Sequence, residues 1–121
     1  MDFHDRDLMN SADLNEANLI DSKLKGASLM GADLTNANLH YASLKHTNSQ
    51  KAIFKINVME YANLDRADLQ NSDLTNASLR FASLECADLR GTIMSRTNLY
   101  ETFHLPLTKE EAKNRRALFL R

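Results

Sequence analysis

Among the residue types that could bind a metal or transfer a proton, the chain contains four histidines. They are His4, His40, His46 and His104, and only His40 and His46 lie close together, six residues apart. A structural zinc site needs nitrogen or sulfur ligands at short, characteristic spacings, and this separation does not supply them. The sequence therefore predicts no bound metal.

Aspartates recur at multiples of five residues along the chain. They are Asp13, Asp33, Asp68, Asp73 and Asp88. General acid–base catalysis needs carboxyl groups that converge on a cleft, whereas this regular spacing indicates the solvent-facing positions of a repeat. The sequence contains neither a glycine-rich phosphate loop nor a nucleophile elbow. We expect a protein that is not an enzyme and that uses no cofactor.

The chain has one cysteine, Cys86, so it forms no intrachain disulfide and no CxxC pair. We expect Cys86 at an outward corner beside Arg66, either as an incidental surface thiol or as a reactive one. The N-terminal sequence MDFHDRDLMN lacks the features of a secretory signal, and no apolar run reaches the ~18 residues of a membrane span. These observations predict a cytoplasmic protein in a reducing compartment without a membrane contact.

The charge is nearly balanced, at −1 over 121 residues. Residues 1–104 contain 14 acidic and 10 basic residues, and residues 105–121 contain two acidic and five basic ones. This distribution gives an acidic body with a basic tail, and it indicates no direct binding of nucleic acid.

Leucine occurs at every fifth position over most of the chain. From residue 11 to residue 100 the sequence divides into 18 pentapeptides, and the fourth residue is leucine in 14 of them. The exceptions are Ser49, Phe54, Met59 and Met94. The second residue is small in every block except at Asn57. A step of five forms no stripe on a helix and alternates faces on a flat strand, so the chain must turn a corner every five residues.

The blocks resemble the A(D/N)LXX pattern of the pentapeptide-repeat family, as in Ala12-Asp13-Leu14 and Ala62-Asn63-Leu64. The resemblance implies an all-β fold, a right-handed quadrilateral β-helix of about 4.5–5 coils with four pentapeptides per coil. It also implies that the leucines and the small residues point inward. We expect this domain to span 1–104, with regular repeats over 11–100, and a C-terminal helical cap over 105–121.

The two ends of the repeat depart from the pattern. Phe3 and Leu8 are five residues apart but Leu8 and Leu14 are six apart, which predicts a one-residue slip near Met9. We expect residues 1–10 to form a distorted first turn that covers the bottom edge.

At the other end, Pro106 stops the ladder, and the capping box at 108–111 predicts a capping α-helix that continues to about Leu120. Apolar residues there are expected either to lie over the top coil or to form a homodimer contact. They are Leu105, Leu107, Ala112, Leu118, Phe119 and Leu120.

Residues 46–60 form the least regular coil. We expect Phe54 to fill part of the volume that Ser49 leaves in the same layer. An inward Asn57 needs a partner such as a backbone carbonyl or Ser49. The coil is either a drifted but ordinary one or a local bulge that creates a recognition feature.

Aromatic residues recur 20 apart, at Tyr41, Tyr61 and Phe81. Four blocks per coil would stack their rings at the ~4.8 Å spacing of neighbouring strands. The same side collects exposed apolar residues, which predicts a partner-binding face, although stacking alone could also explain the rings. The predicted face comprises Ile20, Tyr41, Ile56, Val58, Tyr61, Phe81 and Tyr100.

The leading functional hypothesis is a non-catalytic scaffold that binds a protein partner through this side. The family resemblance implies one alternative, a DNA mimic that inhibits or protects DNA gyrase, topoisomerase IV or a phage-defence nuclease. A mimic needs a continuous ladder of negative charge, whereas Lys25 and Lys45 here continue into Asp65 and Glu85. A third hypothesis is a structural stacking module that dimerises through its C-terminal helix.

Overall fold

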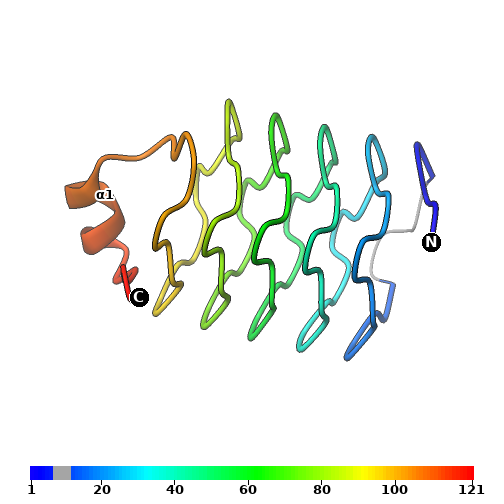
Figure 1. Ribbon diagram of the computed structural model, residues 1–121, viewed down its shortest axis with the longest axis horizontal. Helices are drawn as coiled ribbons and strands as arrows, with labels where there is room; N and C mark the ends of the chain where they lie inside the picture. The colour runs from blue at the N-terminus through cyan, green and yellow to red at the C-terminus, as the bar shows by residue number, and fades with distance from the viewer. Residues whose placement is uncertain (7–11) are drawn as a thin grey trace.

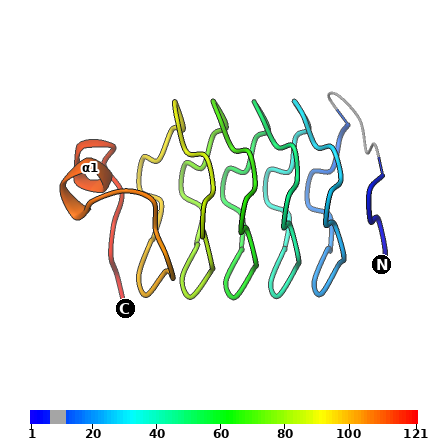
Figure 2. The ribbon, with the colours of Figure 1, turned by 90° about the horizontal axis from the view of Figure 1, so that it is seen from above.

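The computed structural model describes residues 1–6 and 12–121 as a coil of short extended segments, stacked along one axis (Figures 1 and 2). Parallel β-bridges join residues 20 apart, from the pair Asp13 and Asp33 to the pair Ser83 and Phe103. Since each pentapeptide makes one side, a step of 20 residues closes four sides per coil. The predicted β-helix is confirmed, and the span 13–103 forms about four and a half coils.

Each side is one short extended segment, held by backbone hydrogen bonds to the coils on either side. For example, the Asp33 N–H donates to the Ala12 carbonyl (2.9 Å) and the Leu34 N–H donates to the Ile53 carbonyl (2.7 Å). At the corners, the first residue of every pentapeptide from 16 to 101 has a left-handed backbone, with φ between +55° and +72°. This repeated corner is why five residues, and not two or 3.6, set the period of the sequence.

The core is a set of inward columns of leucine and alanine. The centre leucines from Leu24 to Leu84 are 0–1% exposed. Burial of one such side chain contributes about 1.5–3 kcal/mol before the entropy of ordering is deducted. The small second residues, such as Ala32 and Ala37, are also buried and leave room for the leucines. The predicted inward positions are confirmed.

The coil over residues 46–60 keeps the regular ladder, because Asn48, Ile53 and Val58 each bridge to the coil before and the coil after. The alternative of a local bulge is therefore wrong. Ser49 and Phe54 are both fully buried, and the Ser49 hydroxyl lies 3.0 Å from that of Thr47.

The partner that Asn57 needs is a backbone carbonyl. Its amide nitrogen donates a hydrogen bond to the Leu34 carbonyl oxygen. Thr97, two coils further on in the same column, makes the equivalent bond to the Leu74 carbonyl at 2.7 Å. At these two places a polar residue at the inward second position bonds to the coil below, whereas the buried hydroxyl groups of Ser22 and Ser72, at the same block position, have no hydrogen-bond partner among the described residues.

The first residues pair with the first full coil. Asp2 bridges in parallel to Lys23, and Phe3 packs against the core. This offset is 21 residues, whereas the offset from Asp13 to Asp33 is 20, so one extra residue falls between Arg6 and Asp13. The predicted one-residue slip is confirmed; Met9 itself and the column position assigned to Leu8 lie outside the described residues.

The C-terminal helix is shorter than predicted. Helix α1 spans Lys109–Asn114, and its N-terminus carries the predicted capping box between Thr108 and Glu111. The prediction that it continues to about Leu120 is wrong, because Arg116 is left-handed (φ +63°) and the chain then returns to the ladder. Figure 1 shows α1 beyond the last coil, with the C-terminus running back beside that coil.

The returning segment 116–120 continues the pentapeptide register. Its sequence RALFL has a small second residue, Ala117, and an apolar fourth residue, Phe119. Leu118 bridges to Asn98, its N–H donates to the Thr97 carbonyl (2.8 Å), and its carbonyl accepts from the Leu99 N–H (2.7 Å). The backbone bonds and the burial of Ala117 outweigh the weak amphipathic pattern of a longer helix.

Within the described ranges, no helix combines the length and the apolar character needed to cross a membrane, and α1 has only six residues.

The exchange of volume between Ser49 and Phe54 can be tested by unfolding. We expect Ser49→Leu to lower the free energy of unfolding by about 1–3 kcal/mol, because the added methyl and methylene groups meet Phe54 in a filled layer. Adding Phe54→Leu should recover most of that loss. Urea unfolding followed by circular dichroism measures both changes, with Phe54→Leu alone as the control. A double variant much less stable than Ser49→Leu would contradict this account of the packing.

Candidate binding surface

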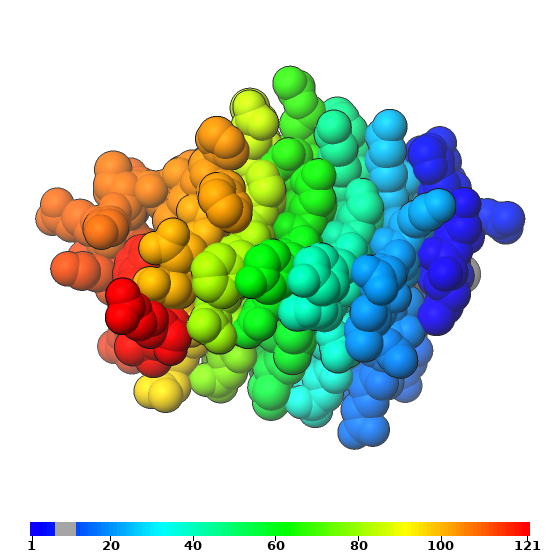
Figure 3. Space-filling view, in the orientation of Figure 1, coloured from blue at the N-terminus to red at the C-terminus, as the bar shows by residue number. Residues whose placement is uncertain are grey.

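One side of the coil carries a run of six stacked segments, which we call the aromatic face. Its bridging residues are Asn18, Asn38, Val58, Ser78, Asn98 and Leu118, one above the other. The six rungs of the aromatic face are 16–20, 36–40, 56–60, 76–80, 96–100 and 116–120. Figure 3 shows such rungs as parallel bands of side chains across one view of the molecule.

At the corner that ends the aromatic face, the rings of Tyr41, Tyr61 and Phe81 are stacked. The ring centroids of Tyr41 and Tyr61 are 5.0 Å apart with 21° between the planes, and those of Tyr61 and Phe81 are 5.0 Å apart with 11°. The predicted ladder is therefore confirmed. We call these three residues the aromatic ladder.

Other rings and a guanidinium extend the aromatic ladder at both ends. His40 meets Tyr41 edge-on at 4.4 Å between centroids, and Tyr100 meets Phe81 edge-on at 5.9 Å. The Arg80 guanidinium lies over the Phe81 ring at 5.4 Å. Each stacked or cation–π contact of this kind stabilises by about 0.5–1.5 kcal/mol beyond the burial of area.

The aromatic ladder occupies left-handed corners, with φ of 60° at Tyr41, 61° at Tyr61 and 63° at Phe81. Glycine and asparagine adopt this conformation at the least cost, and an aromatic residue adopts it rarely. Three aromatic residues thus occupy positions where the backbone conformation favours glycine or asparagine. The stacking contacts offset this cost.

The aromatic face collects exposed apolar side chains. Of the nine large hydrophobic residues that are exposed among the described residues, six lie on this face or its two corners. They are Ile20, Tyr41, Ile56, Val58, Tyr61 and Leu120. Tyr41 is 54% exposed and Tyr61 is 46% exposed. A cluster of this kind on an otherwise polar surface is typical of a contact site.

The structure brings together only some of the residues that were predicted to form the partner-binding face. Tyr41, Tyr61, Phe81 and Tyr100 form one connected group of rings. Val58 lies in the middle of the aromatic face, and Ile56 lies at the opposite corner from the rings, as the first residue of its rung. Ile20 lies on the lowest rung, in the column that also holds His40 and Tyr100. The set is thus spread over one face and not gathered in one pocket.

The C-terminal residues that were predicted to cap the coil or to form a dimer contact fall into two groups. Leu105, Leu107 and Phe119 pack against the core, and Leu118 belongs to the chain's own ladder. Leu120 is 55% exposed and adds to the aromatic face. These residues cap the chain's own coil; dimerisation through α1 stays a prediction.

One ion pair lies along a column of the aromatic face. The Arg80 guanidinium lies 3.5 Å from the Glu60 carboxylate, which also accepts a hydrogen bond from the Ser78 hydroxyl (3.0 Å). Arg121 Nε lies 3.4 Å from the Tyr100 hydroxyl. The side chains of Arg80 and Glu60 are half-buried, at 31% and 24% exposed. Pairs near the surface add little stability, so we expect these contacts to matter more for recognition than for the fold.

The aspartates have a role that the sequence prediction missed. At the third position of a block, an Asp or Asn oxygen accepts the N–H of the residue two further on, which fastens the corner. Asp33 Oδ1 accepts the Thr35 N–H (3.0 Å) and the Thr35 hydroxyl (2.6 Å), and Asn38 accepts the His40 N–H (3.0 Å). The D/N of the A(D/N)LXX pattern, three residues before each corner residue, was the signal for this Asx turn.

These bonds lower the pKa of the carboxyl groups that accept them. The Thr35 hydroxyl and then the Thr35 N–H hold the pKa of Asp33 below its usual range. The Asn15 side chain does the same for the pKa of Asp13, and the Arg90 side chain, 2.6 Å away, for the pKa of Asp88. Hydrogen bonds to the ionised form favour that form.

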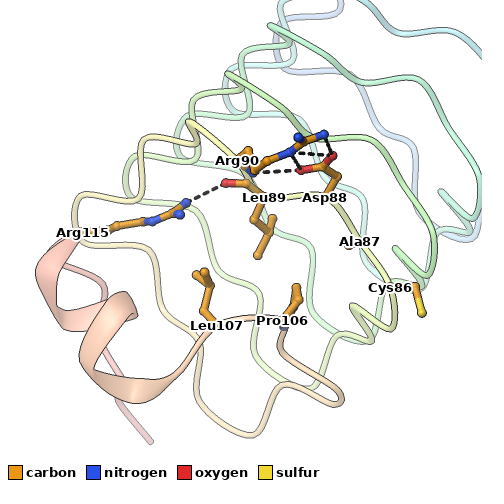
Figure 4. A pocket seen from close by; sticks show the side chains of 8 residues that line it. All are labelled: Cys86, Ala87, Asp88, Leu89, Arg90, Pro106, Leu107 and Arg115. Carbon is orange, nitrogen blue, oxygen red and sulfur yellow. Dashed lines mark hydrogen bonds and ion pairs between the residues drawn. The ribbon is translucent and has the colours of Figure 1, made fainter.

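Two cavities lie where the cap meets the last coil. One, of about 360 Å³, lies between the side chains around Asp88 and Arg90 and the cap residues Leu107 and Arg115 (Figure 4). In it, Arg115 Nη1 donates to the Leu89 carbonyl and the Thr92 hydroxyl, both at 2.6 Å, and so fastens the cap. The other, of about 530 Å³, opens beside Tyr100.

Cys86 and the histidines do not form a metal site. Among the described residues, no three His, Cys, Asp or Glu side chains cluster as metal ligands would. Cys86 is exposed at a corner, and Figure 4 shows it at the edge of the cavity farthest from Arg115.

Short tandem sides and a leucine core define a β-helical repeat protein. The pattern described as "Pentapeptide repeats" matches residues 12–48 and 62–99, in 8 copies. The chain belongs to the pentapeptide repeat family. A comparison with curated proteins gave no match.

Solved structures of the family resemble this chain to different degrees. A pentapeptide repeat protein from the thylakoid lumen of Arabidopsis thaliana is 21% identical, with a TM-score of 0.82 over 93% of this chain and 75% of that one. This likeness shows the fold, a right-handed β-helix.

Two further structures are more distant. Rfr23 from the cyanobacterium Cyanothece 51142 is 21% identical, with a TM-score of 0.49 over 98% of this chain and 91% of that one. QnrB1, a plasmid-mediated fluoroquinolone resistance protein, is 17% identical, with a TM-score of 0.48 over 99% of this chain and 70% of that one.

The turn role of Asp33 predicts a dependence of stability on pH. Because the folded state lowers the pKa of Asp33, this group stabilises the fold at neutral pH, and the contribution is lost as the pH falls below about 4, through the folded pKa. Asp33→Asn keeps the acceptor oxygen but does not titrate. We expect the variant to lose less stability than the wild type between about pH 6 and pH 2 in urea unfolding. Equal losses in both proteins would contradict the role.

Proposed function

We propose that this protein is a non-catalytic scaffold that binds a protein partner through the aromatic face. The observation that carries the proposal is the concentration of exposed apolar side chains there, six of the nine among the described residues. Contact surfaces of proteins are enriched in tyrosine and other aromatic residues, which bury much area at little entropic cost. The cytoplasm stays the predicted location.

The stacking of the aromatic ladder limits what it can bind. Within the stack, neighbouring rings cover each other's faces at 5.0 Å, so Tyr61 presents its edge and hydroxyl outward. A platform for nucleic-acid bases or quaternary ammonium groups needs open ring faces. An edge with hydroxyl groups instead suits the mixed apolar and polar surface of a protein.

The surface gives little support to the DNA-mimic alternative. Some of its carboxylates are paired with cations, as in Asp73 with Lys55 (3.6 Å) and Asp88 with Arg90 (2.6 Å), and the surface column that holds Asp65 and Glu85 also holds Lys25 and Lys45. A mimic of B-DNA needs unpaired negative charge repeated about every 1.7 Å of axis. No enzymatic function is proposed, since the conspicuous features of the surface suit contact and not chemistry.

Substitution in the middle of the aromatic ladder tests the proposal. Tyr61→Glu replaces an apolar edge with a charge that a partner would have to desolvate. We expect immobilised protein to lose capture of its partner by about tenfold or more, measured by quantitative mass spectrometry of the bound fraction. Circular dichroism should stay unchanged, because glutamate adopts the same left-handed corner at Glu16 (φ +59°) and Glu101 (φ +55°).

Lys51→Glu is the matched control. Lys51 is exposed, holds the same block position and has nearly the same φ, 60° against 61°, but stands at a different corner. It should leave capture intact. Capture retained by Tyr61→Glu, or lost equally in both variants, would refute the proposed face.

A supercoiling assay tests the DNA-mimic alternative. Since positive and negative side chains share a surface column, as Lys25 and Lys45 do with Asp65 and Glu85, we expect the protein at about micromolar concentration to leave the supercoiling activity of DNA gyrase unchanged. The reaction without added protein is the control. Inhibition, or protection of gyrase from a quinolone, would favour the mimic over the scaffold.

A further inference from the structure

The charges of the aromatic face change sign from its first rung to its sixth. The first rung and its corner carry Glu16 and Asp21, and the sixth carries Arg116 and Arg121 at the same places. All four side chains are exposed. A surface that is negative at one end and positive at the other suits an antiparallel arrangement with a copy of itself.

The symmetry of such an arrangement is simple. When two copies pack face to face about a twofold axis parallel to the rungs, the first rung meets the sixth, the second meets the fifth and the third meets the fourth. Each corner meets the same corner of the other copy. The axis lies between rungs 56–60 and 76–80.

The residue pairs that this symmetry creates are complementary in charge. Three of the twelve pairs join opposite charges, and none joins like charges. The charged pairs are Glu16 with Arg116, Asp21 with Arg121, and Glu60 with Arg80. Opposite charges at mirrored positions fix register and exclude wrong pairings.

Some of the remaining pairs also match in chemical character, whereas three join an apolar residue to a polar one: Ile56 with Asn76, Asn18 with Leu118, and Val58 with Ser78. Ile20 meets Leu120, and Tyr61 meets Phe81, so apolar groups oppose each other on both sides of the axis. Tyr41 can donate its hydroxyl proton to the carboxylate of Glu101. The other pairs are His40 with Tyr100, Asn36 with Arg96, and Asn38 with Asn98.

We propose that the protein bound by the aromatic face is a second copy of this chain, in an antiparallel twofold dimer. This inference rests on the proposed function of that face. Glu60 and Arg80, already 3.5 Å apart within one copy, would meet the same pair of the second copy. The result is a ring of four alternating charges at the axis.

The size of the face indicates a weak dimer. Six rungs at ~4.8 Å and five residues at ~3.4 Å give roughly 500 Å² per copy, or about 1,000 Å² in total. This area is at the low end for a specific interface. We therefore expect association that depends on concentration over the range from about 10 µM to 1 mM.

The neighbouring face, around Leu44 and Leu64, also has opposite charges at mirrored levels, Lys45 and Asp65. Its mid-strand residues at these two levels are the polar Ser43 and Asn63, and the exposed Phe103 of the same column lies two rungs beyond Asn63. Lys45→Glu is therefore a matched control for charge reversal on a face that the proposal does not use.

Sedimentation equilibrium of charge variants tests the dimer. Glu60→Arg alone places Arg against Arg at the axis, and Arg80→Glu alone places Glu against Glu, so each should associate about tenfold or more weakly than the wild type. An equimolar mixture of the two variants makes both pairs Arg with Glu again. We expect the mixture to recover the association, and Lys45→Glu to match the wild type.

The outcomes separate this inference from the proposed function. A wild type that stays monomeric at about 1 mM, or a mixture that does not recover, overturns the dimer. If Lys45→Glu weakens self-association, the contact lies on the neighbouring face, and the proposed dimer is overturned as well. If capture still depends on Tyr61 in any of these cases, the proposed function stands without the dimer. Circular dichroism of each variant excludes unfolding as the cause.

Discussion

The structure depends on one constraint: each residue must pair with the residue one coil, or 20 positions, further on. Asp33 pairs with Ile53 in this way, the Leu34 N–H donates to the Ile53 carbonyl at 2.7 Å, and the same relation repeats on every side. Such bonds satisfy the backbone of a chain that has no extended sheet. Because the offset between coils is 20 residues from Asp13 onward, residues 20 apart lie above one another in columns. The column of a residue determines whether its side chain lies in the core, at a corner or on the surface.

The columns explain how much the sequence could predict. Leu29, Leu34 and their equivalents have one favourable environment, the interior, so their spacing indicates the fold directly. The aromatic ladder was predictable for the same reason, since residues 20 apart must stack. The position of Ile56 across the aromatic face from the rings also follows from the register, once the corners are known.

The C-terminus was harder to predict because two patterns compete there. The capping box at Thr108 favours a helix, and nothing local fixes where that helix ends. The segment 116–120 keeps the pentapeptide register after an interruption by α1, and its gain comes from Asn98, which is distant in sequence. The partner of the aromatic face was not predictable either, since a contact surface has no spacing rule comparable to that of the core.

The returning segment 116–120 also makes the number of rungs on the aromatic face even. With an even number of rungs, a twofold axis falls between two rungs, and Glu60 of one copy meets Arg80 of the other. With five rungs the axis would pass through the middle rung, and Glu60 would meet Glu60. The added segment 116–120 therefore determines whether opposite charges or like charges meet at the centre of the proposed dimer.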